Sequence, residues 1–301
     1  MAEKMTGLFP PIITCFGEDG KIDERAQRNH VNFLIENGVH GVIPCGSTGE
    51  FINLTEEEYK KVAEIVVDEV NDRVPVIIGA AAHSTKMTIK WAKFAESLGA
   101  NGVLIVPPYY QVLTQGEVCE HYKAASEAIS IPIMLYNNPP VSSVDVQPET
   151  IAHLANEGII SYVKEAQGDP ARIQRIIQLA EDNITVFYGH DINALGAFAV
   201  GAVGWVSGMA NTTPKQWRKI FDLCVKDKDY VKAKELWYKV LAFVNLVCLP
   251  KNNERANWIS YIKEGLEMRG RKVGKVRRPM LPLSKDEREK LKKALKEMGI
   301  I

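Results

Sequence analysis

The chain has 301 residues, of which 46% are hydrophobic, and this is enough for one large core or two moderate ones. Lys plus Arg and Asp plus Glu both total 37, so the net charge is zero and nothing draws the whole chain to nucleic acid or to an anionic membrane. The five cysteines form no CxxC pair, and no apolar run approaches the roughly 18 residues of a membrane span. We therefore expect a cytoplasmic protein that binds a small molecule and holds no metal.

The first 225 residues alternate short strand-like runs with longer amphipathic segments, and this alternation predicts parallel strands joined by helices. Helices are expected over residues 25–38, 55–70, 85–99 and 117–129, where apolar residues recur at spacings of three and four. Thr55 followed by Glu58 has the pattern of a capping box. The eight expected strands begin at Gly7, Gly41, Val74, Gly102, Ile131, Ile160, Ile184 and Ala202.

Eight such units favour a (β/α)8 TIM barrel over residues 1–225, and a doubly wound sheet is disfavoured because no GxGxxG follows the first strand. From about Asp227 the pattern is helical only. We expect residues 226–301 to form C-terminal helices packed on the barrel as one structural unit with it. The basic run RGRKVGKVRR at residues 269–278 has no interleaved aromatic residues, and it predicts a solvated loop rather than a nucleic-acid site.

The run IISYVKEAQG at residues 159–168 ends a buried, β-branched stretch in a lysine, Lys164. In a barrel, catalytic groups lie at the carboxyl ends of the strands, which is the position of Lys164. Each polar residue at that rim also has an ordinary structural explanation, but their arrival together favours a site. The others expected there are Ser47, Thr48, Tyr109, Tyr110, Tyr136 and Asp191.

A single type of reaction would use all of these residues. A partly desolvated lysine can lose its proton and attack a ketone to form a Schiff base, which then serves as an electron sink. Tyr136 is the candidate for moving protons. The GSTG turn at residues 46–49 offers hydroxyls and backbone N–H groups that could hold a carboxylate.

With these motifs the chain resembles the pyruvate-dependent class I aldolases and lyases, a family that includes dihydrodipicolinate synthase and N-acetylneuraminate lyase. The resemblance extends over essentially the whole chain and implies a homotetramer that needs no metal and no organic cofactor. The motifs that carry it are GSTGE at 46–50, PYY at 108–110, YNNP at 136–139, VKEA at 163–166 and GWVSG at 204–208.

The resemblance also implies roles for individual residues. Lys164 would form the Schiff base, Tyr136 would transfer protons, and Thr48 would relay them to Tyr110, which would reach into a neighbouring subunit's site. Ser47 and Thr48 would hold the substrate carboxylate, with the Val206 carbonyl close by. The implied substrate-binding residues are Ser47, Thr48, Val206, Gly189, Asp191 and Val141.

Two departures from the family pattern bear on the second substrate. Synthases of dihydrodipicolinate usually carry an arginine where this chain has Val141, and valine cannot grip a carboxylate. Where N-acetylneuraminate lyases carry an Asp-Glu pair, this chain has Asp191-Ile192. We therefore expect a lyase that reversibly cleaves a 2-keto-3-deoxy sugar acid to pyruvate and an aldehyde.

Several alternatives remain open at this point. Dihydrodipicolinate synthase, which joins pyruvate to aspartate semialdehyde in lysine biosynthesis, uses the same imine, as do N-acetylneuraminate lyase and related 2-keto acid dehydratases or deaminases. A sugar-acid-binding sensor that kept the pocket without turnover is the non-enzymatic alternative.

Overall fold

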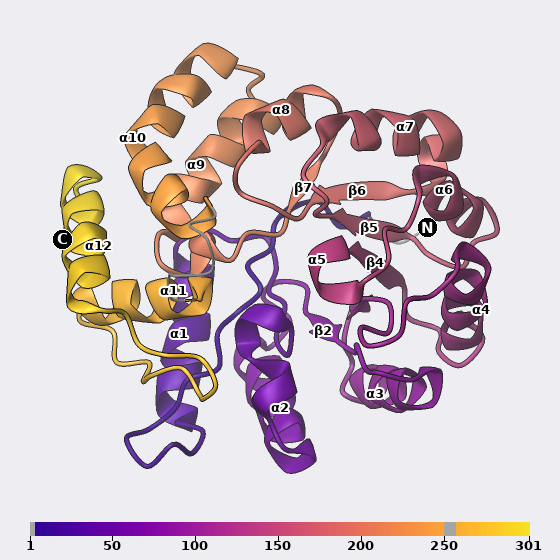
Figure 1. Cartoon of the computed structure of the whole chain (residues 1–301), viewed down its shortest axis with the longest axis horizontal. Coiled ribbons are helices and arrows are strands. Elements are labelled where there is room, and N and C mark those ends of the chain that lie inside the picture. The colour runs from indigo at the N-terminus through magenta and orange to yellow at the C-terminus, as the bar shows by residue number, and fades with distance from the viewer. Residues whose placement is uncertain (1–3, 250–256) are drawn as a thin grey trace.

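A computed structural model describes residues 4–249 and 257–301 (Figure 1). Its centre is a parallel sheet in the order β1-β7-β6-β5-β4-β3-β2, so neighbouring strands follow one another in sequence except where β1 meets β7. The bounds of the strands are β1 Gly7–Leu8, β2 Ile77–Gly79, β3 Gly102–Ile105, β4 Ile133–Asn137, β5 Tyr162–Glu165, β6 Thr185–Tyr188 and β7 Gly204–Trp205.

Residues 42 and 43 lie between the two edge strands of this sheet. Val42 pairs in parallel with Val76, just before β2, and Ile43 pairs in parallel with Pro11, just after β1. The strand expected from Gly41 is thus reduced to isolated bridges, and the expectation of a regular strand was wrong. Proline is the physical reason, because Pro10, Pro11 and Pro44 have no N–H to donate to a ladder.

Helices surround the sheet (Figure 1). Within the described residues, α10, α11 and α12 contact one another beyond the last strand, and α10 also contacts α8 and α9. The bounds of the α-helices are α1 Glu24–Glu36, α2 Glu56–Val70, α3 Thr85–Ser97, α4 Gln115–Ser126, α5 Pro139–Ser142, α6 Pro148–Asn156, α7 Pro170–Ala180, α8 Ala194–Ala199, α9 Pro214–Val225, α10 Tyr230–Cys248, α11 Trp258–Met268 and α12 Lys285–Glu297. The 3-10 turns are η1 Ser47–Gly49, η2 Phe51–Asn53, η3 Glu181–Asn183 and η4 Met209–Asn211.

Local sequence signals placed several helix ends correctly. Both hydrogen bonds of the capping box between Thr55 and Glu58 are present at the start of α2. Gly38 and Gly99 follow α1 and α3 with φ of +83° and +78°, a conformation that glycine adopts without steric cost. The helices expected from about residue 226 onwards are present as α10, α11 and α12, and residues 250–256 lie outside the described part of the chain.

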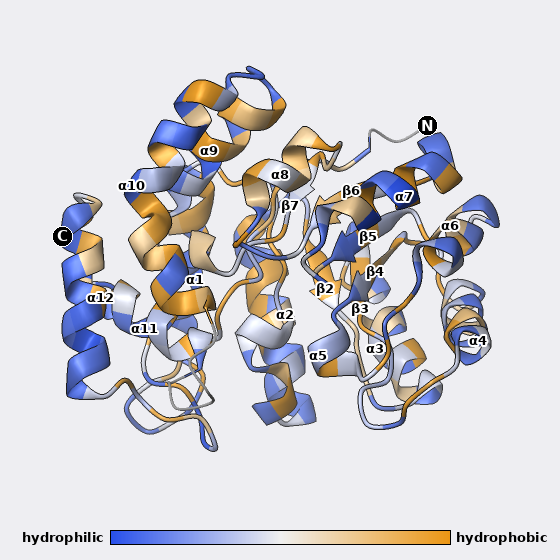
Figure 2. Ribbon diagram, turned by 45° about the horizontal axis from the view of Figure 1, so that its top comes forward, coloured by the Kyte–Doolittle hydropathy of each residue, from blue (hydrophilic) through white to orange (hydrophobic). Residues whose placement is uncertain are grey.

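Two buried clusters form the core. Side chains that point inward from the strands fill the centre of the curled sheet, among them Phe9, Ile77, Leu104 and Phe187. A larger cluster lies between the strands and the helices, and Figure 2 shows the matching apolar inner faces of those helices. Within the described part of the chain, no helix has the length and hydrophobicity needed to span a bilayer.

Candidate functional site

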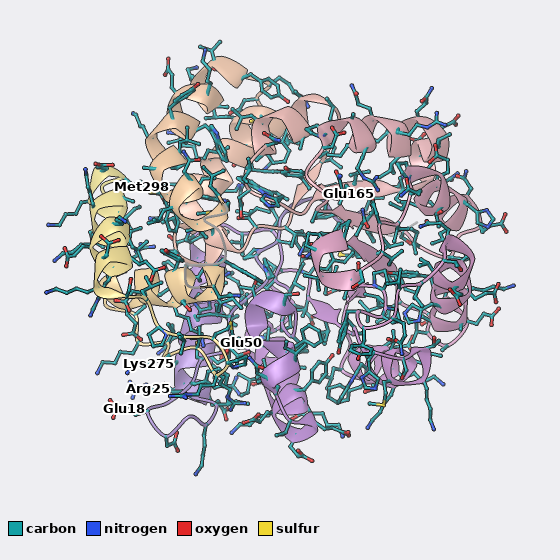
Figure 3. All side chains as sticks on the ribbon, in the orientation of Figure 1. Glu18, Arg25, Glu50, Glu165, Lys275 and Met298 are labelled. Atoms are coloured by element: carbon teal, nitrogen blue, oxygen red, sulfur yellow. The ribbon has the colours of Figure 1, made fainter. Side chains whose placement is uncertain are left out.

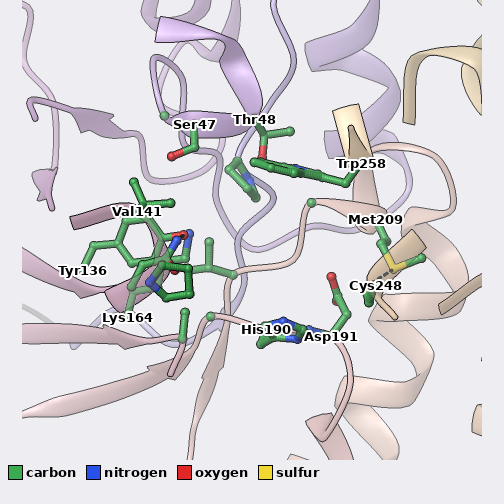
Figure 4. A pocket seen from close by; sticks show the side chains of 18 of the residues that line it. Ser47, Thr48, Tyr136, Val141, Lys164, His190, Asp191, Met209, Cys248 and Trp258 are labelled. Atoms are coloured by element: carbon green, nitrogen blue, oxygen red, sulfur yellow. Dashed lines mark hydrogen bonds between the residues drawn. The ribbon is translucent and has the colours of Figure 1, made fainter. Parts of the chain in front are cut away.

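A cavity of about 600 Å³ opens at the carboxyl ends of the strands (Figure 4). Eight of the ten residues predicted at this rim line it. The exceptions are Tyr109, whose ring packs edge-on against Phe51, and Tyr110, which is 85% exposed and lies outside the cavity. The eight lining residues are Ser47, Thr48, Tyr136, Val141, Lys164, Gly189, Asp191 and Val206.

Lys164 is the centre of this cavity. It pairs with Tyr136 across β4 and β5, and its ammonium nitrogen lies 3.5 Å from the centre of the Tyr136 ring. Only 5% of the residue is exposed, and no ion pair involves it in the described residues. Burial lowers the pKa of Lys164 to about 7, with the charge of Asp191 acting in the opposite direction. A substantial share of the amine is therefore neutral and nucleophilic near pH 7.

Gly189 makes room for that lysine. A Cβ at this position would lie 2.7 Å from Lys164 Cγ and 2.8 Å from Ala166 Cβ, which is closer than real Cβ atoms approach. The sequence-based prediction gave Gly189 a part in binding substrate. In the structure, its missing side chain allows Lys164 to extend into the cavity.

Tyr136 presents its hydroxyl to the same space. The phenol oxygen accepts a hydrogen bond of 2.7 Å from Asn138 Nδ2, and burial raises the pKa of Tyr136 to about 12. The phenol thus keeps its proton at neutral pH and can act as a proton donor. Among the described residues, no hydrogen bond joins Tyr136 directly to Thr48, so the expected relay is not closed within one chain.

The GSTGE turn brings two hydroxyls to the cavity (Figure 4). Ser47 and Thr48 lie in η1, where the amides of Gly49 and Glu50 donate to the carbonyls of Gly46 and Ser47. Those two N–H groups are used within the turn, which leaves the side chains as the clearer donors to a carboxylate. The turn itself is held by Glu50, which is 1% exposed, labelled in Figure 3, and paired with Lys263 at 2.6 Å.

Asp191 is more constrained than the sequence indicates. Its Oδ1 accepts hydrogen bonds from Ser207 Oγ at 2.5 Å and from Trp217 Nε1 at 3.1 Å. Burial raises the pKa of Asp191. Beside it, His190 Nδ1 accepts from the amides of Asp191 and Ile192, so this ring nitrogen carries no proton. Asp191 lines the cavity, but one of its oxygens is already committed to the protein.

A buried network on the opposite face of β4 and β5 fixes the position of the two reactive side chains. Asn137 Nδ2 donates to both carboxylate oxygens of Glu165 at 2.9 and 3.1 Å, and Arg172 Nε lies 3.4 Å from Glu165 Oε2. Asn137 and Glu165 directly follow Tyr136 and Lys164 and are paired in register. Because side chains alternate along a strand, this network lies behind the cavity and holds Tyr136 beside Lys164.

Sequence reasoning missed the wall that the C-terminal part of the chain supplies. Met209 lies in η4, Val247 and Cys248 end α10, and Asn257 and Trp258 begin α11, so only packing brings them to the strand ends. Apart from Asn257, these residues and Val141 make one side of the cavity apolar, and Figure 4 shows several of them facing Lys164 across the opening. The wall consists of Met209, Val247, Cys248, Asn257 and Trp258.

Comparison with known proteins agrees with this architecture. The model of the dihydrodipicolinate synthetase family matches residues 4–298. The 4-hydroxy-tetrahydrodipicolinate synthase of Methanocaldococcus jannaschii is 37% identical over 296 residues, which cover 98% of this chain and 99% of that protein. The protein of the same name from Thermodesulfovibrio yellowstonii is 38% identical over 295 residues, covering 98% and 99%.

Solved structures of named dihydrodipicolinate synthases also superpose closely on this chain. A dihydrodipicolinate synthase of Acinetobacter baumannii, complexed with pyruvate, superposes with a TM-score of 0.92 at 33% identity, covering 99% of this chain and 100% of that one. The Thermotoga maritima enzyme superposes with a TM-score of 0.91 at 32% identity, covering 98% and 99%. The fold and the cavity are those of a class I, Schiff-base-forming, pyruvate-dependent enzyme. The chain belongs to the dihydrodipicolinate synthetase family.

Proposed function

We propose that Lys164 is the Schiff-base lysine and that the enzyme makes or breaks a carbon–carbon bond between pyruvate and an aldehyde. The observation that carries this proposal is a buried lysine without an ion-pair partner in the described residues, with a pKa near 7, facing a tyrosine at 3.5 Å. Nζ adds to the ketone carbon C2 of pyruvate, and the ketone oxygen leaves as water when the imine forms.

The following steps use the imine as an electron sink. Loss of a proton from C3 gives an enamine, and C3 then adds to the aldehyde carbon while the aldehyde oxygen takes up a proton. Water hydrolyses the imine and restores Lys164. The Tyr136 hydroxyl is the proton donor and acceptor, Ser47 and Thr48 hold the pyruvate carboxylate, and the Val206 carbonyl lies beside the bound acid. Cleavage is the same sequence in reverse.

Two aldehydes are candidates. The names of the relatives favour aspartate semialdehyde, and 4-hydroxy-tetrahydrodipicolinate synthesis is therefore the first candidate. The composition of the cavity favours the second, cleavage of a 2-keto-3-deoxy sugar acid. Among the described lining residues Lys164 is the only lysine or arginine, and Val141 offers no grip on a second carboxylate.

Parallel assays separate these candidates. Borohydride trapping with pyruvate should add one pyruvate-derived group to the peptide that contains Lys164. The same preparation should then be assayed for condensation with aspartate semialdehyde and for aldehyde release from a panel of 2-keto-3-deoxy acids. Trapping on another lysine would refute the assignment of Lys164. Efficient condensation without any cleavage would establish the synthase and exclude the sugar-acid lyase.

We also propose that the sheet closes into a (β/α)8 barrel over residues 1–225, with residues 226–301 packed on it. The bridges at Val42 and Ile43 support this closure.

We propose in addition that the protein is a cytoplasmic homotetramer. Tyr110, Val112 and Ile52 are 85%, 78% and 69% exposed, and in this assembly a second subunit would cover exposed side chains of this kind and receive Tyr110 at its site. Light scattering coupled to size exclusion, with Tyr110→Ala as the variant, tests this assembly.

A further inference from the structure

His190 follows β6 and lines the cavity beside Asp191 (Figure 4). The residue is half-buried, and hydrogen bonds hold its backbone from two sides. Its carbonyl accepts from Trp205 Nε1 at 3.1 Å. The amide of the preceding residue, Gly189, donates to the carbonyl of Glu165 at 2.7 Å. The imidazole ring therefore extends from a fixed backbone at the edge of the cavity.

The hydrogen bonds of the His190 ring show which nitrogen carries the proton. Nδ1 accepts from the amide of Asp191 at 2.9 Å and from the amide of Ile192 at 3.1 Å. A proton on Nδ1 would face two other N–H groups, so the proton of the neutral ring is on Nε2. Burial also lowers the pKa of His190, which favours the neutral ring at pH 7. Nε2 is therefore an uncharged hydrogen-bond donor.

This donor is available to a ligand. The only side-chain hydrogen bonds of His190 within the described residues are the two at Nδ1, so Nε2 has no partner there. Nε2 is also not one of the polar atoms that are both unpaired and shielded from solvent. Since His190 lines the cavity, a ligand reaches Nε2 from the cavity. The ring thus offers one donor that the fold leaves unused.

Asp191 offers an acceptor from the same turn. Its Oδ1 accepts from Ser207 Oγ and Trp217 Nε1, which fixes the carboxylate and leaves Oδ2 without a partner in the described part of the chain. Oδ2 is likewise not shielded from solvent. A hydroxyl both accepts and donates, so one hydroxyl, or two on neighbouring carbons, can satisfy His190 Nε2 and Asp191 Oδ2. A carboxylate in that place would be repelled by the charge of Asp191.

The two groups lie where the tail of the aldehyde would extend. Figure 4 shows Ser47 and Thr48 on one side of the opening, and His190 and Asp191 on the other. When Ser47 and Thr48 hold the pyruvate carboxylate, C3 of the imine points away from them, because C1 and C3 lie on opposite sides of C2. The new bond forms at C3, so the aldehyde lies towards His190.

We propose that His190 is a specificity-determining residue, whose Nε2–H binds a hydroxyl on the aldehyde part of the substrate. Asp191 Oδ2 accepts the proton of that hydroxyl or of its neighbour. The preferred aldehyde then carries hydroxyls close to its carbonyl carbon. A site that bonds a hydroxyl discriminates against a ligand that lacks it, because its own polar groups are then left unpaired. This inference rests on the proposed Schiff-base chemistry of Lys164.

The test compares glyceraldehyde with propanal, which has the same carbon chain without the tail hydroxyls. Pyruvate consumption by the full-length protein gives kcat/KM for each aldehyde, and the unmodified protein should prefer glyceraldehyde about tenfold or more. His190→Asn loses the Nε2 donor, while its Oδ1 can still accept from the amides of Asp191 and Ile192. The preference should fall about fivefold or more, mainly through a higher KM for glyceraldehyde.

His83→Asn is the matched control, because it makes the same change at an exposed histidine that does not line the cavity. This variant should keep the preference of the unmodified protein. The ratio of the two aldehydes within one variant does not depend on the fraction of active protein, so partial misfolding cannot imitate the effect. If His190→Asn does not fold, His190→Phe keeps the ring without its nitrogens and should show the same loss of preference.

Three results would overturn the role of His190. They are an equal preference in His190→Asn and His83→Asn, no preference for glyceraldehyde in the unmodified protein, and condensation of aspartate semialdehyde but of neither test aldehyde. Borohydride trapping with pyruvate separates this failure from that of the proposed function. With trapping on Lys164 intact, these results reject the role of His190 alone. Without trapping on Lys164, the Schiff-base proposal fails as well.

Discussion

Two regions of the molecule each bury a lysine, and they treat its charge in opposite ways. Lys263 in α11 is 2% exposed, pairs with Glu50 at 2.6 Å, and donates to the carbonyl of Lys275 at 3.1 Å. Lys164 in β5 is 5% exposed and has a tyrosine ring as its near neighbour instead of a carboxylate. The two lysines are thus buried to nearly the same extent, but Lys263 pairs with a carboxylate and Lys164 faces an aromatic ring.

The difference shows how a reactive lysine is distinguished from a structural one. Burial lowers the pKa of both lysines, but at Lys263 the charge and hydrogen bond of Glu50 counteract it. Lys263 keeps its charge within an ion pair that ties α11 to the GSTGE turn. Lys164 lacks such a pair, so its neutral form is populated near pH 7 and can act as a nucleophile.

The largest effect is expected from Lys164→Met. This change should abolish turnover and borohydride trapping, because the nucleophile is gone. It should also raise the melting temperature by several degrees, since methionine of similar volume removes a charge that has no partner in the fold. Mass spectrometry and thermal unfolding give the two readouts. A variant that lost trapping but also unfolded at a lower temperature would show that Lys164 stabilises the fold, as Lys263 does.

Glu50→Gln should have the next largest effect. It leaves Lys263 buried without its partner, and we expect the free energy of unfolding to fall by about 3–5 kcal/mol. Denaturant titration measures this change. Adding Lys263→Met to Glu50→Gln should recover much of the loss, because no unpaired charge is then left. If Glu50→Gln were as stable as the unmodified protein, the ion pair would not be the support of the turn.

Tyr136→Phe should lower turnover by about a hundredfold, the usual scale for a lost general acid or base. The ring that faces Lys164 is kept and only the hydroxyl is removed, so pyruvate trapping should persist. Steady-state kinetics and trapping on one preparation separate the two functions. Nearly full turnover in this variant would show that Tyr136 packs against the lysine without moving protons.

The pH dependence of imine formation should follow the pKa of Lys164, which is about 7. The initial trapping rate should rise about tenfold per pH unit below pH 6 and level off above pH 8. With an ordinary lysine the rate would keep rising until the pH reached the usual lysine pKa of 10.5. The folded-state pKa is lowered, so between about 7 and 10.5 the unfolded chain binds more protons and this group makes stability increase with pH. Lys164→Met should remove that increment. A trapping rate still rising steeply above pH 9 would contradict the lowered pKa.

The sequence by itself determined the features that rest on local physics. Alternating patterns predicted the parallel strands and their helices, the Thr55 and Glu58 pair marked the start of α2, and a lysine ending an apolar run identified Lys164 as the residue to examine. Five short motifs in order were enough to identify the family. These signals are local because capping, periodicity and strand polarity depend on residues within a few positions of one another.

Only the tertiary structure decided what depends on distant contacts. It reduced the strand expected from Gly41 to two bridges and showed that Gly189 makes room for Lys164. It also brought the wall that includes Trp258 to the cavity at the strand ends, and it packed Arg271 of the basic run on the ring of Phe33 in α1. The prolines near the bridges are visible in the sequence, but the other features have no local signal. Each depends on which side chains from remote segments meet, and close packing of the whole chain settles that.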